Sequence, residues 1–288
     1  MLLVASAARP RQWTKNLIVF VAAIFGLQLT DSTAVARAGG AFVTFCLLSS
    51  AGYLVNDLLD AGADRQHPAK RHRAIASGAL KPTLAAATAA LLAAAALALA
   101  LVLSPGLALA AGAYLLLTLL YSTALKHLVL IDLFAIAGGF VLRAVAGALV
   151  VGVRVSPWLY VCTILVALFL GLGKRRQELA ILEATAGSHR RNLTEYTVDL
   201  VDQLTTIVTA ATIMAYSLYT FSAPYLPRND AMMVTIPLVL YGLFRYLFLV
   251  RTKGLGGSPE ELLLTDRPLL ATAIGWALLS TAVLYLSG

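Results

Sequence analysis

Long apolar segments alternate with short polar connections along the whole chain. Nine such segments can be marked, each near the roughly 20 residues that an α-helix needs to cross a bilayer. Their approximate bounds are 16–29, 39–55, 82–103, 106–121, 130–151, 157–173, 201–221, 232–250 and 268–286. The pattern predicts an all-α, polytopic membrane protein with nine transmembrane helices, of which the first and fourth are short.

Composition supports this interpretation. Of the 288 residues, 60% are hydrophobic and 12% are charged, and the mean hydropathy is +0.83. Both values are typical of a chain embedded in a lipid bilayer. Cys46 and Cys162 lie inside apolar segments without metal-ligand spacing, so they read as small buried hydrophobic residues. Because no Gly/Ser linker or low-complexity stretch divides the sequence, we expect one domain over residues 1–288.

Positive charge is concentrated on alternate connections. The N-terminal arm and the connections after the second, fourth, sixth and eighth segments hold 17 of the 22 Lys and Arg residues. The opposite connections hold Arg37, Arg154 and Arg228, while Arg143 and Arg245 lie within segments. By the positive-inside rule, the first set faces the cytoplasm, with the N-terminus inside and the C-terminus outside. The net charge of +8 therefore reflects loop bias and indicates no nucleic-acid partner.

A cluster of carboxylates follows the second segment. At 100° per residue, Asp57, Asp60 and Asp64 fall within an arc of about 60° on one helix face, and Asn56 precedes them. Carboxylates that converge repel one another, and an all-oxygen ligand set favours Mg²⁺ completed by substrate phosphate. Five cations follow in the same connection: Arg65, Lys70, Arg71, Arg73 and Lys81. We predict that they contact phosphate oxygens. The alternative is a solvated loop between two helices.

Further polar groups occupy the middle of the chain. Tyr121 and Lys126 follow the fourth segment, and Asp132 begins the fifth. Lys126 is a candidate phosphate ligand, and the alternative is a lysine that anchors a helix end at the headgroups. Arg143 lies eleven residues beyond Asp132 on nearly the same helix face, where exposure to lipid costs several kcal/mol. It should face the bundle interior, either pairing with a buried carboxylate or contacting a substrate head group.

The connection after the sixth segment is strongly basic. Gly171 and Gly173 allow close backbone approach, and Lys174, Arg175 and Arg176 place positive charge at the membrane surface. As an isolated run it is a topogenic signal, and beside a carboxylate cluster on the same face it becomes a candidate substrate site. Both long cytoplasmic connections, at about 56–81 and 174–197, are expected to form short helices that cap a cavity.

The Asn-Asp-x-x-Asp-x-x-x-Asp pattern of residues 56–64, at the cytoplasmic end of the second of nine helices, resembles the UbiA superfamily of intramembrane prenyltransferases. That resemblance implies a UbiA-type bundle that binds an isoprenoid diphosphate through Mg²⁺ ions held by two Asp-rich motifs. The second motif is expected after the sixth helix. This chain instead has Lys174 to Glu178 there, with Glu178 and Glu183 as its acids. One metal site is therefore in doubt, and an additional phosphate site is implied.

One branch of the superfamily, the phosphoribosyltransferases that act on decaprenyl phosphate, is the better match. The matching stretches are residues 9–16, with Lys15; Asp64-Arg65, His67-Pro68, Lys70-Arg71 and Arg73; Tyr121-Ser122, Leu125 to His127 and Asp132; Leu142 to Ala144; and Lys174-Arg175 with Glu178. This similarity implies transfer of phosphoribose from phosphoribosyl diphosphate to a polyprenyl phosphate, toward a lipid-linked arabinose donor for cell-wall arabinan. The implied location is the plasma membrane of a bacterial cell, with the active site facing the cytoplasm.

The resemblance also implies roles for individual residues. Asp57, Asp60 and Asp64, assisted by Asn56, hold Mg²⁺ on the diphosphate, and Lys126 acts beside them. Phosphates and other substrate groups are bound by Lys15, Arg65, Lys70, Arg71, Arg73, Tyr121, Asp132, Arg143, Lys174, Arg175 and Tyr196. Glu178 orients a basic side chain or a ribose hydroxyl. A homo-oligomer is possible.

Two other functions stay open at this point. The first is ordinary prenyl transfer from an isoprenoid diphosphate to an aromatic acceptor such as 4-hydroxybenzoate, which the missing second Asp motif disfavours. The second is transport of an anionic solute, with Arg143 and the basic loops as its path. Charges gathered on one face instead of at the midplane argue against transport.

Overall fold

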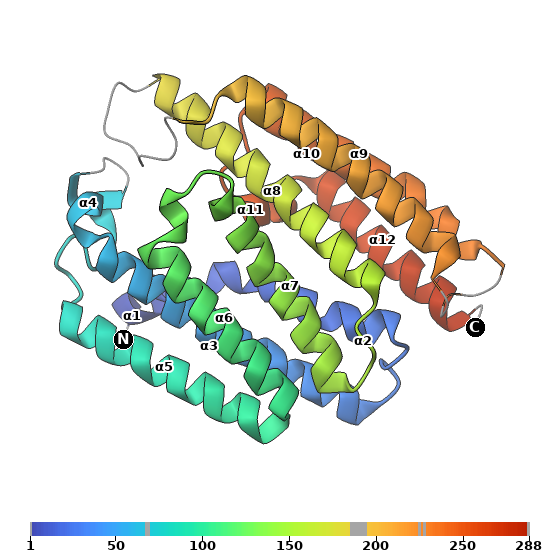
Figure 1. Ribbon diagram of the computed structural model, residues 1–288, viewed down its shortest axis with the longest axis horizontal. Helices are drawn as coiled ribbons and strands as arrows, with labels where there is room; N and C mark the ends of the chain where they lie inside the picture. The colour runs from blue at the N-terminus through green and yellow to red at the C-terminus, as the bar shows by residue number, and fades with distance from the viewer. Residues whose placement is uncertain (1, 67–69, 185–194, 224–225, 227–228, 287–288) are drawn as a thin grey trace. The chain divides into compact units, whose positions relative to one another are not determined.

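The structure is a computed structural model that describes residues 2–66, 70–184, 195–223, 226 and 229–286, and these residues contain helices and no strands (Figure 1). They divide into two compact units. The first comprises Met1–Ala23, Gln28–Ala135 and Gly139–Val155, and the second comprises Ile24–Leu27, Ile136–Gly138 and Ser156–Gly288. The expectation of a single domain stays a prediction.

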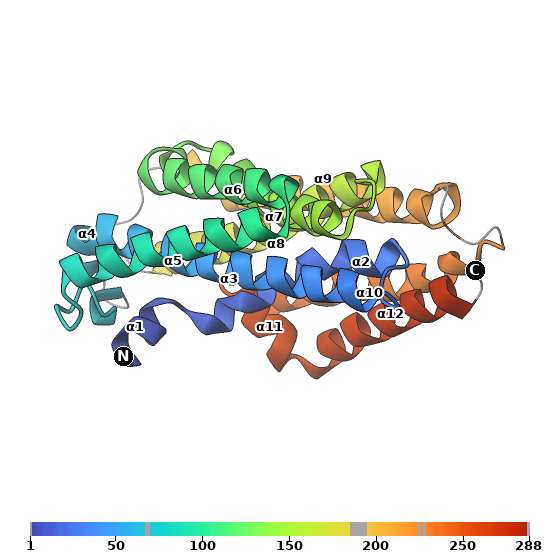
Figure 2. The same ribbon diagram turned by 90° about the horizontal axis from the view of Figure 1, so that it is seen from below.

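The first unit is built around α3 (Ser32–Leu59), which packs against α5 (Pro82–Leu103), α6 (Pro105–Thr123) and the N-terminal helix η1 (Pro10–Phe20). Figure 2 shows α3 and α5 running side by side. The other elements are α1 (Leu2–Ala7), α4 (Ala61–Gln66), η2 (Lys70–His72), η3 (Leu125–His127) and most of α2 (Val21–Phe25) and α7 (Ile131–Val151). Small residues such as Ala96 and Ala100 of α5 are buried in the core, which confirms close helix packing for the alanine-rich segment.

Local sequence explains where these helices begin. Asp31 caps α3 by accepting a hydrogen bond from the backbone N–H of Thr33 at 2.8 Å. Ser104 ends α5 and caps α6, because its hydroxyl accepts from the backbone N–H of Leu107 at 3.0 Å while Pro105 occupies the first helical position. The tight turn between the third and fourth predicted segments is therefore fixed by one serine and one proline.

Eight helices in the described part of the chain are long and apolar enough to span a membrane. They match eight of the nine predicted segments, and the chain is a multi-pass membrane protein. The first predicted segment, 16–29, differs because it begins as the 3₁₀-helix η1 and continues as the short α2. At about 2.0 Å per residue, the eleven residues of this 3₁₀-helix cover roughly 22 Å. The same residues would cover a shorter distance as an α-helix, which rises about 1.5 Å per residue.

The second unit contains α8 (Pro157–Ala184), α9 (Val198–Ser222), η5 (Ala231–Thr235), α10 (Ile236–Lys253), α11 (Pro259–Thr265) and α12 (Arg267–Leu286). The sixth predicted segment ended at residue 173, but α8 continues through the basic run to Ala184. Lys174 to Glu178 therefore lie on a helix and not in a loop. At 1.5 Å per residue, 28 residues give about 42 Å, which exceeds the roughly 30 Å hydrocarbon core.

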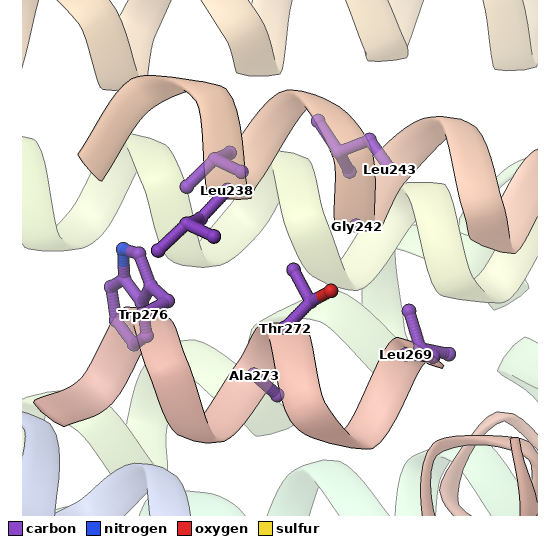
Figure 3. A pocket seen from close by; sticks show the side chains of 8 residues that line it. Leu238, Gly242, Leu243, Leu269, Thr272, Ala273 and Trp276 are labelled. Atoms are coloured by element: carbon purple, nitrogen blue, oxygen red, sulfur yellow. The ribbon is translucent and has the colours of Figure 1, made fainter. Parts of the chain in front are cut away.

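A small apolar pocket of about 170 Å³ lies between α10 and α12 in this unit (Figure 3). Leu238, Leu243 and Leu269 are among its lining residues. The hydroxyl of Thr272 donates to the backbone oxygen of Pro268, and Trp276 Nε1 donates to the hydroxyl of Tyr216. Because both polar side chains are engaged, the pocket offers only apolar contacts, and its volume is below that of a typical small-molecule site.

Candidate active site

The three carboxylates lie where α3 ends and α4 begins, in the first unit. Asp57 is in the last turn of α3, and Asp60 is the capping residue, whose backbone N–H donates to the oxygen of Asn56 at 2.9 Å. The N–H of Asp64 in turn donates to the oxygen of Asp60 at 2.8 Å. Backbone hydrogen bonding thus carries on across the junction. Asp57 and Asp64 are buried, at 4% and 3% exposure.

Arg73 joins two of these carboxylates. Its Nη1 atom lies 3.0 Å from Asp57 Oδ1 and 2.7 Å from Asp64 Oδ2. The guanidinium enters from the turn that follows η2, in the connection predicted to supply phosphate ligands. One nitrogen at hydrogen-bond distance from both side chains shows that Asp57 and Asp64 converge on a shared point where a cation can bridge them.

Arg9 is a second cation on Asp57. Its Nη2 atom donates to Asp57 Oδ1 at 2.6 Å and to Asp57 Oδ2 at 2.9 Å. The guanidinium carbon also lies 5.0 Å from the ring centroid of Tyr53, a cation–π distance. Arg9 precedes η1 in a left-handed backbone conformation, with φ of 52°. The N-terminal arm therefore contributes a side chain to the carboxylate cluster.

Asp60 has a different partner. Lys126 Nζ, from η3, lies 2.5 Å from Asp60 Oδ1, and Asn56 Nδ2 donates to Asp60 Oδ2 at 3.0 Å. The Lys126 side chain is only 5% exposed. This burial favours its placement in the site over the alternative of a headgroup anchor. Lys126 and Asn56 are thus brought to the cluster as the sequence predicted.

The donor set fits Mg²⁺ in part. Asp57 and Asp64 supply oxygen atoms around one point, and carboxylate oxygens are the ligands that this ion prefers. Asp60 faces Lys126 instead, so within the described residues no group of three Asp, Glu, His or Cys side chains is arranged to hold a metal. The prediction of three converging carboxylates is therefore wrong for this arrangement, because the chain closes α3 at Asp60. The bridged pair remains a suitable site.

The other basic residues of this unit lie near the cluster in sequence but make different contacts. Arg65 Nε donates to the backbone oxygen of Ala76 at 3.2 Å, which ties α4 to the following turn. Arg71 is exposed, and its Nε donates to His72 Nε2. Lys15 lies on η1, Lys70 lies on η2, and Lys81 lies just before α5. Their predicted contacts with phosphate remain predictions.

Tyr121 and Asp132 flank the turn that carries Lys126. Tyr121 is half-buried near the end of α6, and Asp132 is fully buried in the first turn of α7. Asp132 Oδ1 accepts a hydrogen bond from the backbone N–H of Leu133 at 2.9 Å. A carboxylate in the first turn of a helix stabilises the helix, because its negative charge interacts favourably with the unpaired N–H groups there. Its role toward a substrate stays a prediction.

Arg143 is buried among neutral partners. Its Nε donates to Asn16 Oδ1 at 2.7 Å, its Nη2 to the Tyr114 hydroxyl at 2.7 Å, and its Nη1 to the backbone oxygen of Gly139 at 2.9 Å. The rings of Tyr114, Phe140 and Phe45 surround the guanidinium at 4.5, 5.4 and 5.8 Å. It faces inward as expected, but none of the described carboxylates pairs with it. These contacts join η1, α6 and α7.

Close backbone packing supports the same junction. A Cβ atom added to Gly147 of α7 would lie 2.0 Å from the backbone oxygen of Val19, so only glycine permits this approach of α7 to η1. Asn16, whose Nδ2 donates to Cys46 and Ser49 on α3, completes the contact. Arg143 thus holds the arm that carries Arg9, and its contacts favour a structural role.

The basic run lies on α8, in the second unit. Lys174 is exposed, whereas Arg175 is 3% exposed, forms an ion pair with Glu178 and lies 5.7 Å from the ring of Tyr196. Glu178 therefore contacts a basic side chain, the arrangement predicted for it. Arg176 pairs with Asp202 of α9 at 2.8 Å, and Arg251 reaches the same carboxylate at 3.5 Å. Substrate contacts of this run stay predictions.

Some sequence-based expectations lie outside the described residues: those for His67, Pro68, Arg190, Arg191 and Arg228, and for the side chain of Glu183. Conversely, the structure adds Arg9 to the cluster, a residue that the sequence placed only in the basic arm. No pattern in the sequence marks this contact, because Arg9 and Asp57 are 48 residues apart.

The chain belongs to the UbiA prenyltransferase family, whose match covers residues 16–256. It is therefore a UbiA-type membrane transferase. A solved structure titled as a UbiA homolog from Archaeoglobus fulgidus bound to GPP and Mg²⁺ superposes with a TM-score of 0.77 over 98% of this chain and 99% of that one, at 18% identity. At this identity the likeness establishes the fold alone.

Two relatives share more sequence. The decaprenyl-phosphate phosphoribosyltransferase of Mycolicibacterium smegmatis is 33% identical over 293 aligned positions, which cover 98% of this chain and 92% of that protein. The protein of the same name from Corynebacterium glutamicum is 35% identical, covering 97% of this chain and 86% of that protein. The predicted resemblance to the UbiA superfamily and to this branch is confirmed.

Proposed function

We propose that the chain transfers phosphoribose from 5-phosphoribosyl-1-diphosphate to a polyprenyl phosphate such as decaprenyl phosphate, releasing diphosphate. The observation that carries this proposal is the joint presence of three carboxylates and three cations at the end of α3. Arg9, Arg73 and Lys126 each lie within 3.0 Å of a carboxylate oxygen. One small region thus holds groups for a metal and groups for phosphate. The names of the 33–35% identical relatives supply the substrate class.

The carboxylates have a specific task in this reaction. Asp57 and Asp64 would hold Mg²⁺ when it binds with the donor, and Asn56 fixes the orientation of Asp60 through its hydrogen bond at 3.0 Å. Bound Mg²⁺ neutralises the negative charge that develops on a leaving diphosphate. Lys126, held by Asp60 and largely shielded from water, adds a fixed positive charge beside the same oxygen atoms.

The bond changes need no general base. An oxygen of the lipid phosphate is already an anion and attacks the ribosyl C1. The bond from C1 to the diphosphate oxygen breaks, and its electron pair leaves with the diphosphate. The protein must therefore place two phosphate-bearing substrates close together and hold their charges, which is the work of cationic side chains.

We assign the binding of the remaining substrate phosphates to the predicted cations. Lys15, Arg65, Lys70 and Arg71 belong to the first unit, and Lys174 and Arg175, with Tyr196 beside them, belong to the second. Lys174 is the member of the basic run on α8 that is exposed. Glu178 holds Arg175 in place. Arg143 contributes indirectly, by fixing η1, since its described hydrogen bonds go to protein groups.

The cellular setting follows from the charge distribution and from the relatives. We propose a bacterial plasma-membrane enzyme whose carboxylate cluster opens to the cytoplasm, where a water-soluble phosphorylated sugar is available. The lipid product is a precursor of a lipid-linked arabinose donor for cell-wall arabinan. A homo-oligomeric state belongs to the same proposal.

The test is a substrate comparison with the purified protein in lipid nanodiscs. One reaction contains labelled phosphoribosyl diphosphate, Mg²⁺ and decaprenyl phosphate, and the other contains an isoprenoid diphosphate and 4-hydroxybenzoate. We expect label in the organic phase of the first reaction, and its loss when a chelator is added. Product in the second reaction alone would replace this proposal with prenyl transfer. Because the chain is a transferase by family, the transporter alternative is not retained.

A further inference from the structure

The two carboxylates that converge are balanced by two cations. Asp57 and Asp64 contribute two negative charges, and Arg9 and Arg73 contribute two positive charges at 2.6 to 3.0 Å. A cluster meant to attract a free divalent cation would carry excess negative charge. This one does not, so the free ion gains little by approaching it.

The contacts also occupy the oxygen atoms that a metal needs. Asp57 Oδ1 accepts from both Arg9 and Arg73, Asp57 Oδ2 accepts from Arg9, and Asp64 Oδ2 accepts from Arg73. Mg²⁺ binds carboxylate oxygens at about 2.0–2.1 Å. An ion at the point shared by Asp57 and Asp64 would coincide with Arg73 Nη1. The guanidinium must therefore leave before the metal binds.

Displacing the arginines has a cost that an anion can offset. Arg9 and Arg73 side chains are 29% and 26% exposed, so each is partly shielded from water. A guanidinium that loses its carboxylate in such a place needs new hydrogen-bond acceptors. Diphosphate supplies them, since Arg matches phosphate oxygens with paired N–H groups. The metal alone supplies none.

We propose that Arg9 and Arg73 form a latch on the metal site, so that Mg²⁺ binds together with the donor diphosphate and only weakly without it. On binding, both guanidinium groups move from the carboxylates to phosphate oxygens. Lys126 stays on Asp60, because its side chain is only 5% exposed. This inference rests on the proposed function for the identity of the diphosphate donor. It assigns Arg9 and Arg73 a positioning role that couples metal binding to donor binding.

The experiment measures binding of Mn²⁺, a paramagnetic substitute for Mg²⁺, to the full-length protein in nanodiscs by electron paramagnetic resonance. Titrations are run with and without inorganic diphosphate, after correction for the Mn²⁺–diphosphate complex in solution. For the wild type we expect weak binding of Mn²⁺ alone and about tenfold tighter binding with diphosphate, within the usual range of coupling between two ligands. Equal affinities in the two titrations would overturn the latch.

Variants separate the latch from a general charge effect. Arg73→Gln should tighten binding of Mn²⁺ alone several-fold and reduce the gain from diphosphate. Arg11→Gln removes the same charge from an exposed side chain two residues from Arg9, so its affinity for Mn²⁺ alone should stay near the wild-type value. Equal tightening in both variants would contradict the latch.

Two controls keep the result interpretable. Arg9→Gln tests the second arm of the latch if Arg73→Gln does not fold, and Arg37→Gln, an exposed residue at the far end of α3, should bind Mn²⁺ like the wild type. None of these titrations uses a phosphoribosyl donor or a polyprenyl phosphate. A wild type that transfers phosphoribose but shows no coupling would overturn the latch alone. Coupling without transfer would overturn the proposed substrate instead.

Discussion

The carboxylate cluster at the end of α3 and the basic run on α8 both contain ion pairs, but their charge balance differs. In the cluster, Asp57 and Asp64 pair with Arg9 and Arg73, and Asp60 pairs with Lys126. On α8 and its partners, three cations, Arg175, Arg176 and Arg251, share two acids, Glu178 and Asp202. A neutral cluster can exchange its partners when a metal and a phosphate arrive. A group of side chains with excess positive charge can bind an anion without first breaking its ion pairs.

The largest effect should come from the neutral cluster. Asp64→Asn keeps the shape of the side chain but removes the charge that Arg73 and the metal share. We expect transfer to fall by about 100-fold or more, as when one electrostatic group of an active site is removed. The matched control is Asp31→Asn at the other end of α3, because Asn remains a good N-cap. Wild-type activity in Asp64→Asn would remove the cluster from the mechanism.

The basic run should respond through substrate affinity. Lys174→Gln should raise the KM for the donor about tenfold with little change in kcat, since one hydrogen bond to a charged group contributes about 1.5 kcal/mol. Lys253→Gln, an exposed lysine at the end of α10 in the same unit, is the control. If both variants have the wild-type KM, the excess charge on α8 serves topology and not binding.

Arg143 differs from the cations of both regions, because it is buried and its hydrogen-bond partners are neutral. Arg143→Met leaves Asn16 Oδ1 and the Tyr114 hydroxyl without their donor, and each unsatisfied buried group costs about 1–3 kcal/mol. We expect the thermal midpoint in detergent to drop by several degrees, whereas Arg37→Met should leave it unchanged. A midpoint equal to that of the wild type would show that Arg143 does not hold η1 in place.

The smallest effect concerns an ion pair that belongs to neither region. Asp266, just before α12, accepts from Arg245 Nη2 at 2.8 Å and Nε at 3.2 Å, and from the backbone N–H of Leu269 at 2.9 Å. The hydrogen bonds from Arg245 lower the pKa of Asp266, and the contact with Leu269 adds to this shift.

A lowered pKa in the folded state gives stability above the unfolded pKa of about 3.9, and this stability is lost as the pH falls through the folded value. Asp266→Asn should therefore melt slightly below the wild type at pH 7. The difference should shrink once the pH falls below about 4. A difference that stays constant with pH would assign the effect to packing and not to charge.

Much of the fold could be predicted from the sequence, because a bilayer restricts the secondary structures that can cross it. Apolar length predicts the helix at 82–103, where α5 has the same bounds, since every backbone group in lipid needs an internal partner. The length of an apolar segment does not predict where a helix ends if that helix continues beyond the lipid. The basic run ends an apolar segment without ending α8, because Lys, Arg and Glu are good helix formers. The 3₁₀ geometry of η1 has no marker in the sequence, and in the structure η1 packs against α3 and α7.

The sequence predicted most of the residues that form the site, but it did not predict which of them contact one another. Periodicity predicted three converging carboxylates, of which Asp57 and Asp64 converge on Arg73 while Asp60 faces Lys126, and proximity in sequence indicated Arg73. The partners of Arg143 were not predictable, because Asn16 and Tyr114 lie 127 and 29 residues away and carry no charge that would mark them. Arg9 was missed for a similar reason. Its contact with Asp57 spans 48 residues and depends on how η1 packs against α3.

The most direct test of the central claim is the mass of the lipid product. Purified protein in nanodiscs is incubated with phosphoribosyl diphosphate, decaprenyl phosphate and Mg²⁺, and the extracted lipid and the released diphosphate are quantified together. We predict a lipid heavier by one ribose phosphate, formed in equal amount with diphosphate and absent with Asp64→Asn. Unchanged decaprenyl phosphate, or a new lipid formed without release of diphosphate, would contradict the account.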